Sequence, residues 1–114
     1  MSECIFCKIV SGQVPSTIVH RDEEIVAFRD LSPQAPVHLL VVPVRHIASL
    51  SDASEGDRAL LGSILLRIRD LAAREGIDRG GYRVVTNRGT SAGQSVFHLH
   101  FHVLGGRPMA WPPG

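Results

Sequence analysis

The sequence predicts an α+β domain in which an antiparallel or mixed sheet carries one long helix on one face. Short β-prone runs precede and follow a single segment of helical periodicity, so the order is three strands, a helix and two strands. Only one connection is long enough for a crossover, which favours antiparallel neighbours. A chain of 114 residues with 44% apolar residues suits one such domain and is too short for two, so we expect a single domain over residues 1–114.

The first two strands are predicted from the β-prone runs Ser16–His20 and Glu24–Arg29. Three charged residues separate them, a pattern typical of a hairpin. The following segment, DLSPQAP, contains two prolines and is expected to be a loop. The run VHLLVV at 37–42 is almost entirely aliphatic, as expected of a strand in the middle of a sheet, and Pro43 ends it.

The long helix is predicted from Ser54 to Glu75. Its apolar residues recur at intervals of three, four and one, as in an amphipathic helix: Leu60, Leu61, Ile64, Leu65, Ile68, Leu71 and Ala72. Ser54 and Asp57 resemble a capping box at its start, and Gly76 is the expected stop. Two further strands, YRVVTN at 82–87 and VFHLHFHVL at 96–104, flank the loop RGTSAGQS.

The last predicted strand carries three of the six histidines, at positions 98, 100 and 102. Because successive side chains of a strand point to opposite faces, these histidines share one face and the apolar residues between them share the other. Same-face neighbours are about 6.6 Å apart, so two rings can bind one ion but not all three. An isolated His-x-His pair is equally consistent with a polar sheet surface, whereas three in register after a Gly/Ser/Thr loop favour a phosphate site.

Charge and hydropathy exclude several classes of protein. The net charge is +1 and no basic run is longer than two, so the chain lacks the basic stripe that bulk nucleic acid needs. The longest apolar stretch, Leu39–Val44, contains a proline and is far shorter than the roughly 20 residues that span a bilayer. The start, MSECIFCK, has no apolar signal region, so we expect a cytoplasmic protein with no membrane partner.

The run HLHFHVL at 98–104 resembles the signature of the histidine triad (HIT) superfamily of nucleotidyl hydrolases and transferases. The blocks CIFCKIVSGQVPS, AFRDLSPQAPVHLLVVPVRH, GYRVVTNRG and GQSVFHLHFHVLGGRPMAWPPG resemble the Hint branch, histidine triad nucleotide-binding proteins that act as nucleoside phosphoramidases. The resemblance covers nearly the whole chain. It implies a single HIT domain with a five-stranded, mainly antiparallel sheet, one long helix and a short N-terminal helix.

The resemblance implies hydrolysis of purine nucleoside 5′-phosphoramidates by double displacement. His100 corresponds to the family's nucleophile, which expels the amine and forms a nucleotidyl-histidine, and water then releases the nucleoside monophosphate. His102 and Ser95 would supply donors to the phosphate oxygens and a proton to the leaving amine. His98 and His38 would orient or relay, although a lone histidine in a central strand is usually a hydrogen-bonded core residue.

Nucleotide recognition is also implied by the resemblance, with a purine nucleotide such as AMP as substrate or product. Asp30 would accept hydrogen bonds from the ribose hydroxyls, although an aspartate before Ser-Pro is otherwise a routine turn residue. The expected apolar cleft, which could equally be ordinary core, is formed by Phe6, Ile9, Phe28 and Leu31. The residues expected around the phosphate are Asn87, Gly93, Gln94 and Ser95. Trp111 would reach the site of a neighbouring subunit in a homodimer.

Cys4 and Cys7 form a C-x-x-C pair, which is ambiguous between redox chemistry and zinc. A thioredoxin-like pair lies between a strand and a helix of a βαβ unit, and the sequence predicts no such unit. Zinc takes four N or S ligands, and His46 and His98 complete the set, a combination used by related uridylyltransferases. We therefore expect a structural Zn²⁺ and no organic cofactor.

Alternative functions remain open. One is a dinucleoside polyphosphate hydrolase of the same fold, a branch that often carries Gln where His102 stands. Others are a nucleotide-binding interaction protein with incidental hydrolysis and a zinc-binding module without catalysis. A homodimer is expected if the strand at 82–87 lies at a sheet edge, because its unpaired backbone groups, Val84 and Val85 would otherwise face solvent. The resemblance to the Hint branch implies the same pairing.

Overall fold

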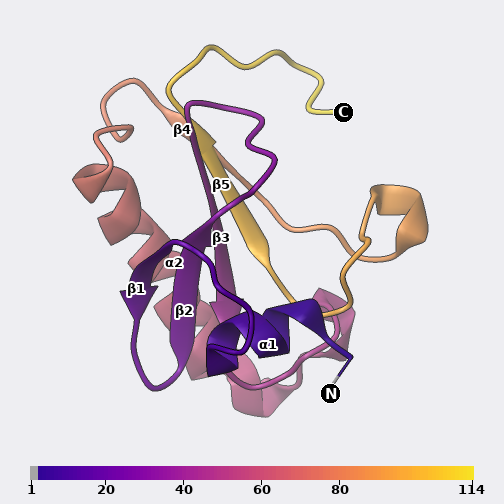
Figure 1. Ribbon diagram of the computed structural model, residues 1–114. Coiled ribbons are helices and arrows are strands. Elements are labelled where there is room, and N and C mark those ends of the chain that lie inside the picture. Colours follow the sequence, from indigo (N-terminus) through magenta and orange to yellow (C-terminus); the bar gives the residue numbers. More distant parts are fainter. Residues whose placement is uncertain (1–2) are drawn as a thin grey trace.

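Five strands of the described residues, 3–114, form one sheet in this computed structural model (Figure 1). They are β1 (Ile18–Arg21), β2 (Ile25–Arg29), β3 (Val37–Pro43), β4 (Tyr82–Val85) and β5 (Phe101–Gly105). Their order across the sheet is β1-β2-β3-β5-β4, and every neighbouring pair is antiparallel. The prediction of an antiparallel or mixed sheet is confirmed in its antiparallel form, with the aliphatic run at 37–42 in the central strand.

Two α-helices, α1 (Ile5–Ser11) and α2 (Arg58–Arg74), accompany the sheet. Three short 3-10 turns lie between the larger elements: η1 (Leu50–Asp52), η2 (Glu55–Asp57) and η3 (Thr90–Ala92). The predicted start of the long helix at Ser54 is wrong by one turn, because residues 55–57 form the 3-10 turn η2. The backbone N–H of Ser54 donates to the Asp57 carboxylate at 2.8 Å, and α2 begins directly behind this cap.

The two helices cover opposite faces of the sheet, with α1 in front and α2 behind in Figure 1. This arrangement follows from the alternation of side chains along the two most buried strands, β2 and β3. The face toward α2 carries Ile25, Ala27, Leu39 and Val41 against the helix residues Ile64, Ile68 and Leu71. The face toward α1 carries Val26, Phe28, Leu40 and Val42 against Phe6 and Ile9. The periodicity of residues 54–75 therefore predicted only one of two covering layers.

The last predicted strand is shorter than expected. Only Phe101–Gly105 pairs as β5, whereas the alternation predicts a strand over 96–104, and β4 ends at Val85 rather than at Asn87. The segment before β5 is instead held to the residues that follow β3, because Leu99 N–H donates to the Ile47 carbonyl at 2.6 Å. Side chains still alternate: Leu99, Phe101 and Val103 lie in the core against α2. The alternation therefore extends beyond the hydrogen-bonded ladder that defines the strand.

None of the helices within residues 3–114 is long and apolar enough to cross a lipid bilayer.

Candidate active site

Two strands and the segment before one of them bring four histidines together on the α1 side of the sheet. His38 lies on β3 and His102 on the neighbouring β5, while His98 and His100 come from the residues that lead into β5. Neighbouring ring centres are 5.1 Å apart for His100 and His102, and 5.2 Å for His38 and His102. His38, His98 and His100 are buried, so their ring nitrogens depend on protein partners for hydrogen bonds.

His100 has one partner that defines its tautomer. Its Nδ1 lies 2.7 Å from the backbone carbonyl oxygen of His98, which can only accept, so Nδ1 carries the proton. In the neutral ring the other nitrogen, Nε2, then holds the lone pair. Phe6 packs edge-on against this ring with centres 5.0 Å apart, and the Thr86 hydroxyl donates to the His100 carbonyl at 2.8 Å. The result is a fixed imidazole with a nucleophilic nitrogen.

His102 has the opposite tautomer, set by a chain of donors that begins on the backbone. Gln34 N–H donates to His38 Nδ1 at 3.0 Å, which places the His38 proton on Nε2. His38 Nε2–H donates in turn to His102 Nδ1 at 2.9 Å. The remaining nitrogen of a neutral His102, Nε2, must then carry a proton. Two imidazoles that stand side by side thus offer one acceptor and one donor.

The neutral state of His102 is maintained by its surroundings. Burial, together with the neighbouring rings of His100 and His38, lowers the pKa of His102 to about 4. Burial also lowers the pKa of His38, against the opposing effect of Asp30. At pH 7 both rings are therefore uncharged, and the donor chain through them is intact.

A hollow of about 240 Å³ lies in front of His100 and His102. It is lined by six of the residues predicted to bind the nucleotide: Phe6, Ile9, Phe28, Asp30, Leu31 and Ser95. The side chains of Phe6, Ile9 and Phe28 are also part of the buried cluster between α1 and the sheet. Leu31 is 88% exposed, so this apolar side chain is free to cover a ligand. The hollow thus has an apolar end and an imidazole end.

Asp30 lies at the edge of the hollow, immediately after β2. Its Oδ1 accepts from Ser32 N–H at 2.8 Å, and its Oδ2 is 3.4 Å from His38 Nε2. The turn role expected of an aspartate before Ser-Pro is therefore present. One carboxylate oxygen remains directed toward the histidines, so the same residue can serve both as a turn cap and as a ligand acceptor.

Other predicted residues lie around the loop that precedes the histidines. Gly93 has φ 97° at the end of η3, a conformation that favours glycine. Gln94 is buried within the loop, and Ser95 is exposed at the rim of the hollow. Asn87 lies between β4 and η3, and Trp111 is 81% exposed in the tail. Of these, Ser95 is the residue that lines the hollow with His100 and His102.

Sequence reasoning missed several lining residues of the hollow. They are Ile5, Ser16, Arg29, Leu40 and Val96. Ile5 and Val96 are next to predicted residues, so their position in the chain was a usable signal. Ser16 carried no such signal, because it reaches the hollow only through the pairing of β1 with β2, where Thr17 O accepts from Arg29 N–H at 3.0 Å.

A second cluster joins α1 to the start of the histidine segment. Cys4, Cys7, His46 and His98 each direct one ligand atom inward, and these atoms all lie within 4.8 Å of one another. The separations from Cys4 Sγ and Cys7 Sγ to His98 Nδ1 are 3.4 and 3.5 Å, and Cys7 Sγ is 3.4 Å from His46 Nδ1. A tetrahedral zinc site separates sulfur from nitrogen by roughly 3.5 Å, given bonds of about 2.3 and 2.0 Å. The four residues fit that ion.

The tautomer of His98 also suits a metal. Its Nε2 donates to the Pro43 carbonyl at 2.8 Å, which leaves the Nδ1 lone pair facing both thiols. Such an outer hydrogen bond fixes the orientation of a metal-ligating imidazole. His98 thereby belongs to the cysteine cluster, while its carbonyl holds His100, and this one residue connects the two clusters.

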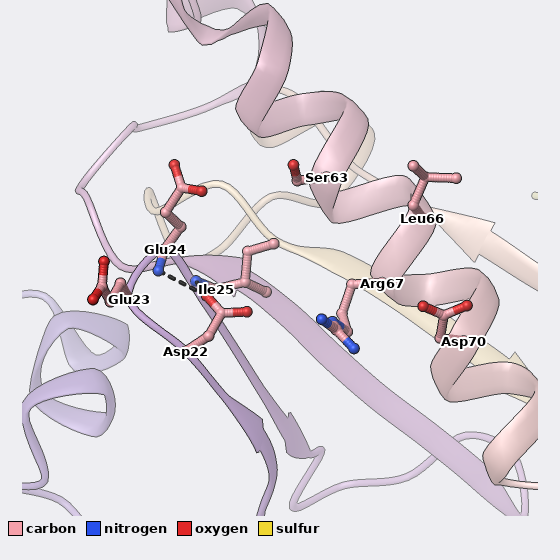
Figure 2. A pocket seen from close by; sticks show the side chains of 8 residues that line it. All are labelled: Asp22, Glu23, Glu24, Ile25, Ser63, Leu66, Arg67 and Asp70. Atoms are coloured by element: carbon pink, nitrogen blue, oxygen red, sulfur yellow. Dashed lines mark hydrogen bonds between the residues drawn. The ribbon is translucent and has the colours of Figure 1, made fainter.

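A larger hollow of about 470 Å³ lies between the β1–β2 turn and α2 (Figure 2). Its lining includes four carboxylates, Asp22, Glu23, Glu24 and Asp70, against one cation, Arg67, so its charge is net negative. Asp22 is committed to the turn, since its Oδ1 accepts from Glu24 and Ile25 N–H at 2.8 Å each. A surface with this charge repels phosphate, so the smaller hollow at the histidines is the better candidate for an anionic ligand.

Known proteins are similar to this chain over nearly its whole length. Residues 3–110 match a family model described as "Scavenger mRNA decapping enzyme C-term binding". An uncharacterized HIT-like protein of Synechococcus elongatus is 52% identical over 115 residues, which cover 100% of both chains. The crystal structure of a HIT family hydrolase from Legionella pneumophila is 51% identical with a TM-score of 0.97, over 98% of this chain and 100% of that one. A histidine triad nucleotide-binding protein from Candida albicans is 32% identical with a TM-score of 0.83, over 96% and 83%.

Proposed function

Because this chain belongs to the HIT family and is hydrolase-like, we propose that it hydrolyses purine nucleoside 5′-phosphoramidates through a covalent intermediate on His100. The observation that carries the proposal is the pair of opposite tautomers at His100 and His102 in one hollow. Displacement at phosphorus needs a lone pair on one side and donors to the non-bridging oxygens on the other. In their neutral forms these two rings offer both.

In the first step, the His100 Nε2 lone pair forms a bond to the α-phosphorus while the bond from phosphorus to the amine breaks. His102 Nε2–H donates to a non-bridging oxygen, where charge increases in the transition state. The exposed Ser95 hydroxyl at the rim of the hollow donates to a second non-bridging oxygen and can relay a proton from water to the leaving amine. Throughout the step, His100 Nδ1–H remains bonded to the His98 carbonyl.

In the second step, water attacks the same phosphorus and passes one proton back to solvent through the Ser95 hydroxyl, while the electron pair of the P–N bond returns to His100 Nε2. The nucleoside monophosphate is released and the starting tautomer is restored. The apolar end of the hollow, formed by Phe6, Ile9, Phe28 and Leu31, accepts the base. The Asp30 carboxylate accepts from the ribose hydroxyls through the lone pairs that Ser32 N–H and His38 leave unused. A purine suits this arrangement because it offers a large apolar face to the aromatic pair Phe6 and Phe28, whose centres are 5.5 Å apart.

The test is turnover of an adenosine 5′-phosphoramidate by the purified protein. We predict that His100→Ala folds, binds AMP and loses nearly all turnover, because it lacks the only proposed nucleophile. An acid quench of the wild type during turnover should trap a nucleotidyl adduct that is missing from this variant by mass spectrometry. His20→Ala is the matched control, since His20 lies on β1 outside the hollow and pairs with Asp22 in the turn that follows. Wild-type turnover by His100→Ala would remove His100 from the mechanism.

The same assay separates the competing functions. Faster cleavage of a dinucleoside polyphosphate than of the phosphoramidate would favour the other hydrolase branch. Tight AMP binding with no turnover of either substrate would favour an interaction protein.

We further propose that Cys4, Cys7, His46 and His98 hold a structural Zn²⁺. The distances among their ligand atoms and the fixed tautomer of His98 support this ion. When bound, the metal would tie α1 to the segment before β5, and its chemistry would be structural. We also propose a cytoplasmic location, because a reducing compartment keeps both thiols available as ligands.

A homodimer completes the proposal. β4 lies at an edge of the sheet, where Val84 is 38% exposed, and Leu65 on α2 is 52% exposed although it belongs to the helix's apolar pattern. Pairing of two β4 strands about a two-fold axis would cover the open edge. Trp111 would then approach the partner's site. In its own chain this side chain is 81% exposed, and the tail runs at the end of the sheet away from α1 (Figure 1).

A further inference from the structure

The side chain of Gln94, a buried polar residue beside the proposed site, makes three hydrogen bonds to the backbone. It is 3% exposed. Its Nε2 donates to the Ala48 carbonyl at 2.8 Å and to the Val96 carbonyl at 3.1 Å. Its Oε1 accepts from Gly89 N–H at 2.8 Å. Both amide protons are therefore used within the protein.

Two of these bonds are local and the third is long-range. Gly89 and Val96 are five and two residues from Gln94, whereas Ala48, two residues after His46, is 46 residues away. The backbone N–H of Gln94 also donates to the Gly89 carbonyl at 3.0 Å, so Gly89 and Gln94 are joined by two bonds of opposite direction. Residues 89–94 thus form a closed loop that is fixed to the segment following β3.

These hydrogen bonds leave the Gln94 side chain unable to donate to a phosphate. A phosphate oxygen needs a donor, and Gln94 has no amide proton left to donate. The next residue is in a different position, since Ser95 is exposed, lines the hollow and has a hydroxyl that can donate. The direction of the Ser95 side chain depends on the backbone at 94–96, which is held from one side by the Gln94 amide.

We propose that Gln94 is a positioning residue that acts through Ser95, and that it makes no contact with the substrate. This inference rests on the proposed function, because Ser95 matters only if phosphorus is attacked in this hollow. The physical reason is preorganisation: a donor stabilises transition-state charge only if it is already in place when the charge develops. The Gln94 bonds hold the loop in that arrangement without a ligand.

The experiment is a double-mutant cycle between Gln94→Met and Ser95→Ala, with an adenosine 5′-phosphoramidate as substrate. Methionine has the length of glutamine and lacks its donors and acceptor. We expect each single variant to lower kcat on the order of 10²-fold, the usual effect of losing one donor to transition-state charge. The double variant should fall no further than the single variants, because both changes remove the same donor. Affinity for adenosine, which has no phosphate, should stay within about twofold of wild type in all three variants.

A second variant, a matched control and an exchange measurement keep the test decisive. Gln94→Glu is the second variant; it retains the acceptor for Gly89 N–H and loses both donors, and it serves if Gln94→Met does not fold. Gln13→Met is the matched control, since Gln13 is exposed at the end of α1 and should turn over normally. Hydrogen exchange at the Gly89 amide of the ligand-free protein should be slow in the wild type and faster in Gln94→Met.

Losses in kcat that multiply in the double variant would overturn the proposal, because Gln94 would then act independently of Ser95. A large loss of adenosine affinity in Gln94→Met would also overturn it and indicate a general structural role. If the wild type neither turns over the substrate nor binds AMP, the proposed function fails instead, and slow exchange at Gly89 would still show that the loop is held as described.

Discussion

His100 and His102 are the same residue type two positions apart, yet their hydrogen bonds give them opposite roles. A carbonyl oxygen faces Nδ1 of His100, and a ring N–H faces Nδ1 of His102. The first partner forces the proton onto Nδ1 and the second forces it onto Nε2. The difference comes from a single neighbour at each ring, so the chemistry of the pair depends on which group contacts each Nδ1 atom.

The lowered pKa of His102 has a consequence for stability. In the unfolded chain a histidine titrates near 6.5, whereas folding lowers the pKa of His102 to about 4. Between these values the unfolded state binds the proton and the folded state does not, so the stability from this residue is present at pH 7 and decreases as the pH falls below about 6.5. Burial acts in the same direction on His38 and His98.

We predict that His102→Gln reduces the loss of stability on acidification. Between pH 7 and pH 5 the wild type should lose roughly 1–2 kcal/mol more unfolding free energy than the variant. Urea unfolding of both proteins at both pH values measures this difference, with a chelator present throughout so that metal release cancels. Equal acid sensitivity of the two proteins would contradict the lowered pKa.

At the scale of elements, the short helix α1 has a larger role than its seven residues suggest. It supplies Phe6 and Ile9 to the core of one sheet face, and Ile5, Phe6 and Ile9 to the hollow. Cys4, at its N-terminus, accepts from Cys7 N–H through Sγ at 3.3 Å. A helix of this length is not stable alone, so its position depends on tertiary contacts, among which the cysteine cluster is prominent.

Removal of the proposed metal should therefore loosen α1. We predict about one Zn²⁺ per chain in protein purified without chelator, and a lower Tm after treatment with a strong chelator, because binding to the folded state alone adds stability. Cys7→Ser should have a low Tm that no longer responds to the chelator. A stoichiometry near zero, with both thiols free to titrate, would refute the zinc proposal.

The junction between α2 and β5 leaves no space for a side chain at Gly105. A Cβ at this position would lie 2.8 Å from both Cβ and Cδ1 of Ile77, in the segment that follows α2. We predict that Gly105→Ala destabilises the protein by about 1–3 kcal/mol, the usual cost of overpacking. Gly62→Ala is the control: Gly62 lies in α2, where an added Cβ would meet nothing within 4 Å, and the change should stabilise by about 0.5–1 kcal/mol. Urea unfolding should therefore shift in opposite directions for the two variants.

At the scale of the whole molecule, the sheet has two edges, β1 and β4. β1 is interrupted by an irregularity between Ile18 and His20, a feature that discourages pairing with another strand. β4 pairs with β5 in unbroken register from Tyr82 to Val85, and its other side faces outward. β4 is therefore the edge better suited to pair with a second copy.

We predict that light scattering reports twice the 12.4 kDa chain mass for the wild type and a smaller mass for Val84→Arg. A charge at a two-fold strand pair meets its own copy, and like charges opposite each other repel. Ile18→Arg on β1 is the matched control and should remain dimeric. A monomeric wild type at micromolar concentration that turns over normally would contradict the homodimer.

The dimer also predicts a role for Trp111. Trp111→Ala should alter discrimination among leaving amines more than it alters binding of AMP, because the proposed contact is made across the interface on the leaving-group side. Competition between two phosphoramidates that differ only in their amine measures the first effect, and AMP titration measures the second. An unchanged preference between the amines would remove the tail from the site.

Local patterns in the chain were enough to predict which faces of the elements are buried. The continuous aliphatic run at 37–42, the alternation along 98–104 and the 3.6-residue period of α2 are enforced by burial, so the central strand, the long helix and the common face of the histidines could be predicted. The pattern could not show where a ladder ends. Residues 96–100 alternate like a strand but bond to the segment after β3, so that β5 begins only at Phe101.

The protonation pattern of the site and the use of Gln94 are fixed by the fold and could not be read from the chain. A histidine or a glutamine has the same local propensity whether its partner is a carbonyl, an N–H or a phosphate. Some partners are local, such as the His98 carbonyl for His100, but others are 46 to 94 residues away, as for Ala48 with Gln94, His38 with His102 and Cys4 with His98. Hydrogen bonds over such separations depend on the packing of β3 against β5 and of α1 against the sheet. Residue type is a property of the sequence, but the direction of each donor is a property of the folded molecule.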